Sequence, residues 1–231
     1  MKAMHIDDVL DRAHVVSLPL AVRFRGITTR EALLIDGPAG WGEFAPFLEY
    51  GPAESAAWLR AGLEAAYEGF PEPVRDSIEV NATIPAVPAS EVPAVVERYP
   101  GCRTFKIKVA EKGHTLADDA ARVRAVRDAV TQRGDIPILR VDANGGWSVD
   151  EAVEAAQMMM PLDYMEQPCA TTEELAQVRG RLMRAGLFVR VAADESIRKV
   201  ADPYRVAELQ AADVAVVKPA PLGGVRRVLE V

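Results

Sequence analysis

The stretch Thr104-Phe105-Lys106-Ile107-Lys108 decides the fold, because it is a short apolar run that carries ionisable side chains at its carboxyl end. The same arrangement returns at 139–144, 164–168, 191–196 and 214–219. The ionisable residues that close these segments are 24 to 34 residues apart, which leaves room for one strand and one returning helix. This period predicts a parallel β/α barrel, in which the carboxyl ends of successive strands converge on one mouth.

The sequence on either side of this stretch predicts a small α+β module over 1–77 and a run of β/α units over 78–231. In the first part, we expect strands at 13–20, 30–35 and 41–44 and a helix over 53–69, from their apolar periodicity. The proline-bearing segment 70–75 is the expected boundary.

The second part alternates predicted strands with predicted helices. We expect strands at 78–84, 104–109, 138–141, 164–166, 189–192 and 214–217. We expect helices at 89–96, 116–131, 149–160 and 203–210, with others opening near 172 and after 223. Ser148 is the expected N-cap of the helix at 149–160. Six strands are fewer than the eight of a complete barrel of about 250 residues. The fold class is therefore predicted as α/β, a TIM-type (β/α) barrel truncated after strand six, with an amino-terminal α+β domain.

Composition restricts the kinds of partner. The 231 residues are 49% hydrophobic, enough for a packed core, and carry a net charge of −7, which offers no basic surface for nucleic acid or membranes. Cys102 and Cys169 are too few for a disulfide framework, and neither a leader-like apolar segment nor a membrane-length apolar run is present. We expect a cytoplasmic protein with a small-molecule partner, and the sequence leaves its oligomeric state open.

Three carboxylates end consecutive strands: Asp142, Glu166 and Asp194. Oxygen-only ligands suit Mg²⁺, with Mn²⁺ as the alternative metal. Acidic residues at strand ends also cap helices or face solvent, but this explanation has to be repeated in three successive units. The pattern favours a metal site.

Lys106 and Lys108 are two residues apart on one strand, so both point to the same face. A like charge and a nearby metal lower the pKa of a lysine, so we expect one of the pair to be neutral near pH 7 and to act as a base. The alternative is a solvated lysine pair on an exposed edge.

Two further cations are site candidates. Lys218 ends the apolar run 214–217 and, in a barrel, would face Lys108 across the mouth. Arg140 shares a face with Asp142, and we expect it to hold the Lys108 region electrostatically. Asn144 and Glu195 are expected to support the ligands, while Gln167 is expected only to support the turn before Pro168.

The ordered set K-x-K at 106–108, D-A-N at 142–144, E-Q-P at 166–168, D-E-S at 194–196 and K-P at 218–219 resembles the enolase superfamily. It is similar to the muconate-lactonising-enzyme-like branch, over about residues 78–225. The resemblance implies that Lys108 and Lys218 are an acid/base pair, that the three carboxylates bind Mg²⁺, and that 1–77 is a domain capping the barrel mouth. The implied chemistry is removal of a proton α to a carboxylate, through an enediolate stabilised by the metal.

Within that branch, the short amino-terminal region, Arg140 and the D-E-S motif resemble the o-succinylbenzoate synthases of menaquinone biosynthesis. That resemblance implies a dehydration in which Lys108 takes the proton and then assists loss of hydroxide, while Lys218 stays charged. N-acylamino acid racemases and dipeptide epimerases have the same lysines and ligands and are the first alternative. A non-catalytic barrel that only binds a metal or a protein is the second.

Overall fold

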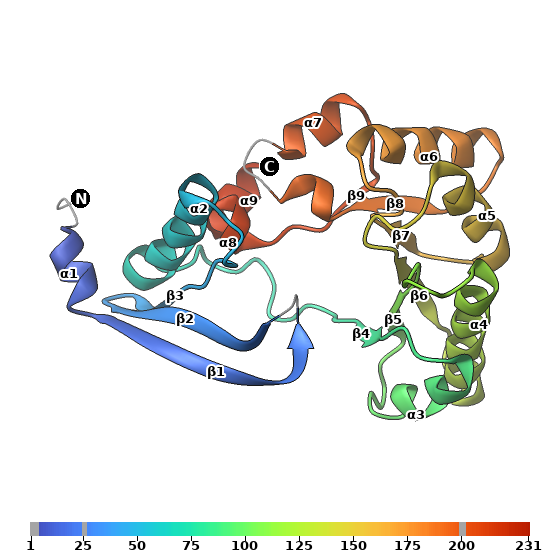
Figure 1. The fold of residues 1–231 in the computed structure, drawn as a ribbon, viewed down its shortest axis with the longest axis horizontal. Helices are drawn as coiled ribbons and strands as arrows, with labels where there is room; N and C mark the ends of the chain where they lie inside the picture. Colours follow the sequence, from blue (N-terminus) through green and yellow to red (C-terminus); the bar gives the residue numbers. More distant parts are fainter. Residues whose placement is uncertain (1–4, 25–26, 199–201) are drawn as a thin grey trace. The chain divides into compact units, whose positions relative to one another are not determined.

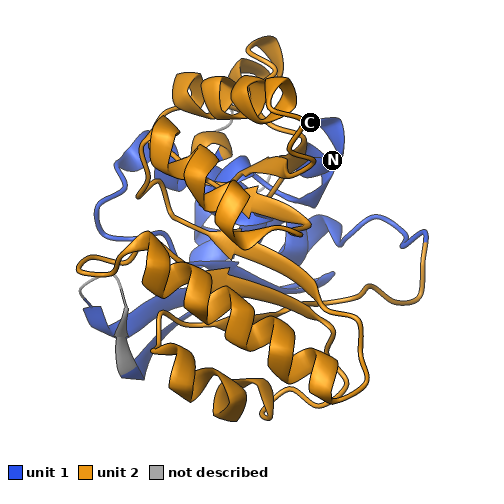
Figure 2. Ribbon diagram, turned by 90° about the vertical axis from the view of Figure 1, so that its right-hand side faces the viewer, with its two compact units in different colours: residues 1–74, 198–200, 217–231 blue, residues 75–197, 201–216 orange. Residues whose placement is uncertain are grey.

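The structure, a computed structural model, describes residues 5–24, 27–198 and 202–231. The chain forms two compact units (Figure 2). Unit 1 comprises 1–74, 198–200 and 217–231, and unit 2 comprises 75–197 and 201–216. Residues 217–231 therefore pack with the amino-terminal elements, although the sequence alone placed them with the barrel. Within the described residues, none of the helices combines the length and the apolar character that crossing a bilayer requires.

Unit 1 is an antiparallel sheet of order β1-β2-β3 with helices packed against it. Its elements are α1 (Ile6–Leu10), β1 (Ala13–Phe24), β2 (Ile27–Gly37), β3 (Gly40–Phe44), α2 (Pro52–Leu63), the π-helical η1 (Glu64–Glu68), α8 (Pro219–Leu222) and α9 (Val225–Glu230). The predicted strands and helix are confirmed here, with the last turn of the helix widened into η1. Gly40 turns β2 into β3 with φ of 140°, a backbone conformation that favours glycine.

Unit 2 is a parallel sheet whose strands follow one another in chain order, β4-β5-β6-β7-β8-β9. Its strands are β4 (Ala82–Ile84), β5 (Thr104–Lys108), β6 (Ile138–Asp142), β7 (Tyr164–Glu166), β8 (Arg190–Ala193) and β9 (Val214–Ala215). Its helices are η2 (Ala89–Glu91), α3 (Val92–Val96), α4 (Leu116–Gln132), α5 (Val149–Met159), α6 (Thr172–Arg184), η3 (Glu195–Ile197) and α7 (Asp202–Glu208). The α/β class and six parallel strands in barrel order are confirmed.

The core of unit 2 lies between the sheet and the helices α3 to α6, which follow one another along it (Figure 1). Phe105 and Ile107 of β5 are fully buried on the helix side. Lys106 and Lys108 alternate with them and so project from the other face of the sheet. The sheet thus gives one face to the apolar core and the other to the ionisable residues.

Two strands are shorter than the sequence predicts. The predicted strand 78–84 is ordered as a strand only from Ala82, and Ile78 and Val80 are exposed. The predicted strand 214–217 is paired only at Val214 and Ala215, with one further hydrogen bond from the Val216 amide. In the described residues each of these strands has a partner on one side only, so less backbone pairing holds it extended.

Candidate metal and acid/base site

The sheet register of unit 2 places the predicted ionisable residues in rows. Lys108 pairs with Asp142 across β5 and β6, and Asp142 pairs with Glu166 across β6 and β7. One layer earlier, Lys106 pairs with Arg140. Because paired residues in a parallel sheet point to the same side, four of the predicted site residues come together at the carboxyl edge.

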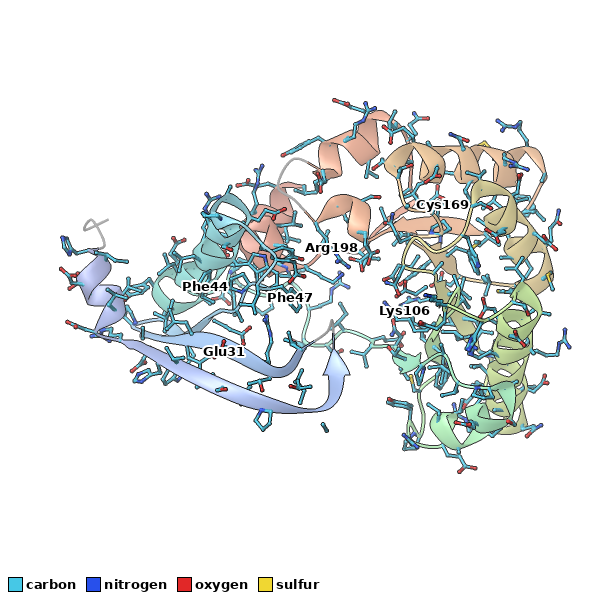
Figure 3. The ribbon with its side chains drawn as sticks, viewed as in Figure 1. Glu31, Phe44, Phe47, Lys106, Cys169 and Arg198 are labelled. Atoms are coloured by element: carbon cyan, nitrogen blue, oxygen red, sulfur yellow. The ribbon has the colours of Figure 1, made fainter. Side chains whose placement is uncertain are left out.

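The two lysines and two carboxylates form one bonded cluster, with Lys106 marked on β5 in Figure 3. Lys106 Nζ lies 2.8 Å from Glu166 Oε1 and 3.1 Å from Asp142 Oδ2. Lys108 Nζ lies 2.6 Å from the same Asp142 oxygen and 2.7 Å from Asn144 Oδ1. Asp142 and Glu166 are each 1% exposed, so these contacts are shielded from water. Asp142 is therefore the centre of the cluster.

Burial and the neighbouring opposite charges act in opposite directions on the pKa of each group. Burial by itself would lower the pKa of Lys106, but its hydrogen bond to Glu166 and the charges of Asp142 and Glu166 raise it well above the usual value. Lys106 is therefore not the neutral member of the pair in this structure, and a neutral lysine at this site stays a prediction. Its two carboxylate partners, Asp142 and Glu166, stabilise the ammonium form.

The carboxylates respond differently from one another. Burial would raise the pKa of Asp142, yet the hydrogen bond from Lys108 and the charges of both lysines hold it below its usual value. Burial, with the charges of Asp142 and Asp194, raises the pKa of Glu166 even though Lys106 donates a hydrogen bond to it. Of these two carboxylates, Glu166 is thus the one whose negative charge is less fully compensated.

The donor set fits a hard divalent cation. Asp142, Glu166 and Asp194 are buried, and Glu166 Oε2 has no hydrogen-bond partner among the described residues. A buried carboxylate oxygen left without a donor is costly unless a cation or water meets it. In the described part of the chain, no three acidic, histidine or cysteine side chains form a preformed cluster, and the Lys106 ammonium bridges Asp142 and Glu166 instead. Ammonium and cation would use the same oxygens.

The expected supporting residues lie beside this cluster. Asn144 accepts from Lys108, donates its backbone N–H to Asp142 Oδ1 at 3.1 Å, and donates from Nδ2 to Glu195 Oε1 at 3.2 Å. Asp194 follows β8 and is 5% exposed. Asn144 therefore joins the carboxyl ends of β6 and β8, as a bridge between the two loops.

Arg140 is held elsewhere. Its Nε donates to Asp163 Oδ2 at 2.9 Å, its Nη1 donates to Asn81 Oδ1 at 2.9 Å, and its guanidinium lies 4.8 Å from the Tyr164 ring centroid. No described contact joins Arg140 to Lys108. The expected hold on the Lys108 region is thus not what the structure shows: Arg140 braces the start of β7, one layer below the carboxylates.

Lys218 is the N-cap residue of α8 and belongs to unit 1, whereas the cluster belongs to unit 2. Its position facing Lys108 stays a prediction.

Sequence reasoning gave Gln167 too small a role and missed the buried pair Asp119 and Arg122. The sequence does contain a sign of this pair. Its two charged residues are three positions apart, on the same face of α4 as the apolar Val126 and Val130. Gln167 has no such pattern, because its role depends on contacts with residues far along the chain.

Comparison with known proteins gives consistent matches. The family model described as Enolase C-terminal domain-like matches residues 89–231, and the one described as Enolase N-terminal domain-like matches residues 15–66. The chain is 59% identical to a protein named o-succinylbenzoate synthase from Mycolicibacterium smegmatis, over 98% of this chain and 68% of that protein. It is 57% identical to a protein of the same name from Mycobacterium leprae, over 98% of this chain and 65% of that protein. The chain thus spans about two thirds of the length of these relatives.

Solved structures share the fold. The L-Ala-D/L-Glu epimerase from Bacillus subtilis has a TM-score of 0.75 at 24% identity, covering 94% of this chain and 76% of that one. Muconate lactonizing enzyme from Pseudomonas putida has a TM-score of 0.67 at 24% identity, covering 94% and 74%. A protein from Roseovarius nubinhibens, solved as a complex with magnesium, has a TM-score of 0.70 at 21% identity, covering 95% and 74%.

Proposed function

Because this chain belongs to the enolase superfamily, and within it to the o-succinylbenzoate synthases, we propose that it dehydrates a succinyl-hydroxycyclohexadiene carboxylate to o-succinylbenzoate. It is a lyase that removes water, and the step lies in menaquinone biosynthesis. The observation that carries the proposal is the bonded cluster of Lys106, Lys108, Asp142 and Glu166 at the carboxyl edge of the sheet. Two amines beside buried carboxylates are the groups that such a reaction needs.

Asp142, Glu166 and Asp194 would hold Mg²⁺, with Mn²⁺ as a substitute. When bound, the ion supplies positive charge that stabilises the negative charge developing on the substrate carboxylate. Their burial supports this role, because a charge interaction is stronger in a site that excludes water. The oxygens that now accept hydrogen bonds from Lys106 and Lys108 would be shared with the ion, so the amines and the ion compete for them.

Lys108 is the residue to which we assign the proton transfer. Its amine takes the proton α to the carboxylate and, as an ammonium, returns a proton to the departing hydroxide. Asn144 accepts a hydrogen bond from Lys108 Nζ and so limits where the amine points. Lys218 stays charged and stabilises the opposite side of the substrate. Lys106 stays an ammonium, because its contacts with Asp142 and Glu166 raise its pKa. Its positive charge offsets part of the negative charge of these two carboxylates.

We also propose that the protein is located in the cytoplasm. Both cysteines are free, as a reducing cytoplasm permits, and the substrate is a small carboxylate.

The test is Mg²⁺-dependent formation of the aromatic product, followed by its absorbance, with the full-length protein that contains this chain. Lys108→Ala and Lys218→Ala should each lose turnover, by about 10²-fold or more. Lys112→Ala removes an exposed lysine from the loop after β5 and is the matched control. This variant should keep the wild-type turnover.

Two outcomes would contradict the proposal. Absence of dehydration, together with deuterium exchange at the α-carbon of N-succinylamino acids or dipeptides, would make the protein a racemase or an epimerase. Unchanged turnover in Lys108→Ala would mean that this lysine is not the base.

A further inference from the structure

We propose that Gln167 is a positioning residue that fixes the three loops carrying the cation ligands, through a buried side chain that bonds to the Asp194 segment. The inference rests on the proposed function, since it concerns the same carboxylates. Gln167 follows Glu166 directly in the chain and is fully buried. It touches none of the reacting groups described above.

The amide of Gln167 makes four hydrogen bonds, three of them to the loop after β8. Its Oε1 accepts from the backbone N–H groups of Asp194 and Ser196, each at 3.1 Å. Its Nε2 donates to Ser196 Oγ at 2.8 Å and to the Cys169 carbonyl at 2.9 Å. The side chain therefore links the end of β7, where Glu166 lies, to the backbone of Asp194 itself.

The backbone of Gln167 adds the third loop. Its carbonyl accepts from the Gly145 N–H at 2.7 Å, three residues after Asp142, and its N–H donates to the Ala192 carbonyl at 2.8 Å. To make these bonds Gln167 takes a φ of 39°, in the left-handed region that a residue with a side chain rarely adopts. Its side-chain and backbone bonds are thus made together, at the cost of some backbone strain.

A glutamine is the side chain that meets these demands. The site requires two donors and an oxygen that accepts twice, at the reach of three side-chain carbons. Glutamate has the reach but no donors, and it would bring a fourth buried negative charge beside three carboxylates. Methionine has the size but leaves two N–H groups, a hydroxyl and a carbonyl without their partner. Each substitution should therefore shift the separation between Glu166 and Asp194.

The experiment measures cation affinity directly. The metal-free protein is titrated with Mn²⁺, and free Mn²⁺ is read by electron paramagnetic resonance, for wild type, Gln167→Met and Gln167→Glu. We expect Gln167→Met to bind Mn²⁺ at least about 10-fold more weakly, as found when groups that orient metal ligands are removed. In Gln167→Glu, the added charge attracts the ion while the lost donors misplace its ligands, so we expect a rise in the substrate KM and a fall in kcat.

The controls separate positioning from folding. Gln157→Met changes an exposed glutamine of α5 to the same residue and should leave the affinity unchanged. Ser196→Ala removes one acceptor of Gln167 and should weaken Mn²⁺ binding a few-fold even if both Gln167 variants fail to fold. Wild-type affinity in Gln167→Met or in Ser196→Ala, with only the melting temperature lowered, would overturn the inference.

The same titration distinguishes this inference from the proposed function. If wild type binds Mn²⁺, Gln167→Met binds it weakly, and neither dehydrates the substrate, the proposed reaction fails and the positioning role stands. If wild type does not bind Mn²⁺, the positioning role fails.

Discussion

Arg122 shows how much of the support for Lys108 comes from residues outside the reacting cluster. Its side chain is 1% exposed and lies under the loop that follows β5. The guanidinium donates to the carbonyls of Val87 and Lys108 at 2.6 and 3.0 Å and to Asp119 Oδ1 at 2.7 Å. The other oxygen of Asp119 accepts from the Ala110 N–H at 2.8 Å. The buried ion pair of Arg122 and Asp119 thus holds the backbone at Lys108, the proposed base.

Arg122→Met should destabilise the protein by about 3 to 5 kcal/mol, because the buried Asp119 loses its opposite charge and the carbonyls of Val87 and Lys108 lose a donor. Urea unfolding followed by circular dichroism measures the change. Arg127→Met is the control on the same helix. Among the described residues Arg127 donates to the carbonyls of Met159 and Pro161 alone, and its loss should cost about 1 to 2 kcal/mol. Equal losses in the two variants would contradict the special role of the buried pair.

Asp163 gives a prediction about pH. Burial would raise its pKa, but hydrogen bonds from Arg140 and Arg190 hold the pKa below its usual value. A depressed pKa means that the stabilisation is complete above the unfolded pKa of about 3.9 and is lost as the pH falls through the lower, folded value. Asp163→Asn should therefore be less stable than wild type by about 1 to 3 kcal/mol at neutral pH.

This difference should shrink as the pH falls below about 4, because wild type then loses the same charge. Unfolding curves collected from pH 7 to pH 3 measure it. Asp128→Asn, which removes an exposed carboxylate of α4, is the control and should give a small difference at every pH. A constant gap between Asp163→Asn and wild type across this range would show that the ion pair is not its origin.

At the level of elements, the helices α4, α5 and α6 begin in the same way. Each has a capping box, formed by the pairs Thr115 with Asp118, Ser148 with Glu151, and Thr171 with Glu174. Each box fixes the residue at which a helix begins, and so determines the length of the loop that precedes the helix. Each of these loops follows a strand that carries site residues. The predicted helix at 149–160 and its Ser148 cap are confirmed for this reason, since capping is a local property.

Ser148→Ala should destabilise the protein by about 1 kcal/mol, because the Glu151 N–H loses its acceptor at the positive end of α5. Ser148→Gly should cost only a few tenths of a kcal/mol, since glycine is tolerated at this position. Thermal unfolding of the two variants against wild type tests this ranking. No measurable loss in Ser148→Ala would mean that the cap hydrogen bond contributes little.

At the level of the whole molecule, the chain returns to unit 1 after β9. Glu64 of η1, which is 6% exposed, accepts hydrogen bonds from the N–H groups of Val225 and Arg226 at 2.6 and 3.0 Å and from the Arg226 guanidinium at 3.0 Å. Gly224 permits this approach, because a Cβ there would lie 1.9 Å from Glu64 Oε2. One carboxylate thus anchors the residues that follow Lys218.

Glu64→Gln should loosen this anchor, because an amide supplies one weaker acceptor where the carboxylate supplies two charged oxygens. Hydrogen–deuterium exchange should become faster at the amides of Val225 and Arg226 and stay unchanged in β5 to β8 of unit 2. Glu68→Gln is the control, since within the described residues the Glu68 carboxylate pairs with the Arg226 side chain alone, at 3.5 Å. Equally fast exchange throughout both units would indicate global destabilisation rather than release of the anchor.

The sequence by itself determined the parallel β/α order and the row of ionisable residues that includes Lys106, Lys108, Asp142 and Glu166. It did so because side chains alternate with a period of two along a strand, and because charged residues stop an apolar run where the strand ends. The helices and the Ser148 cap were also predictable, since they depend on neighbours in the chain.

Only the tertiary structure decided which groups these residues meet. Three features depend on contacts between segments 20 or more residues apart. They are the raised pKa of Lys106, the pairing of Arg140 with Asp163, and the bonds from Gln167 to the Asp194 loop. The return of 217–231 to unit 1 is decided in the same way, by the fit of Gly224 against Glu64. The physical reason is that periodicity fixes the face on which a side chain lies, whereas its partner, its burial and hence its pKa depend on register and packing with other segments.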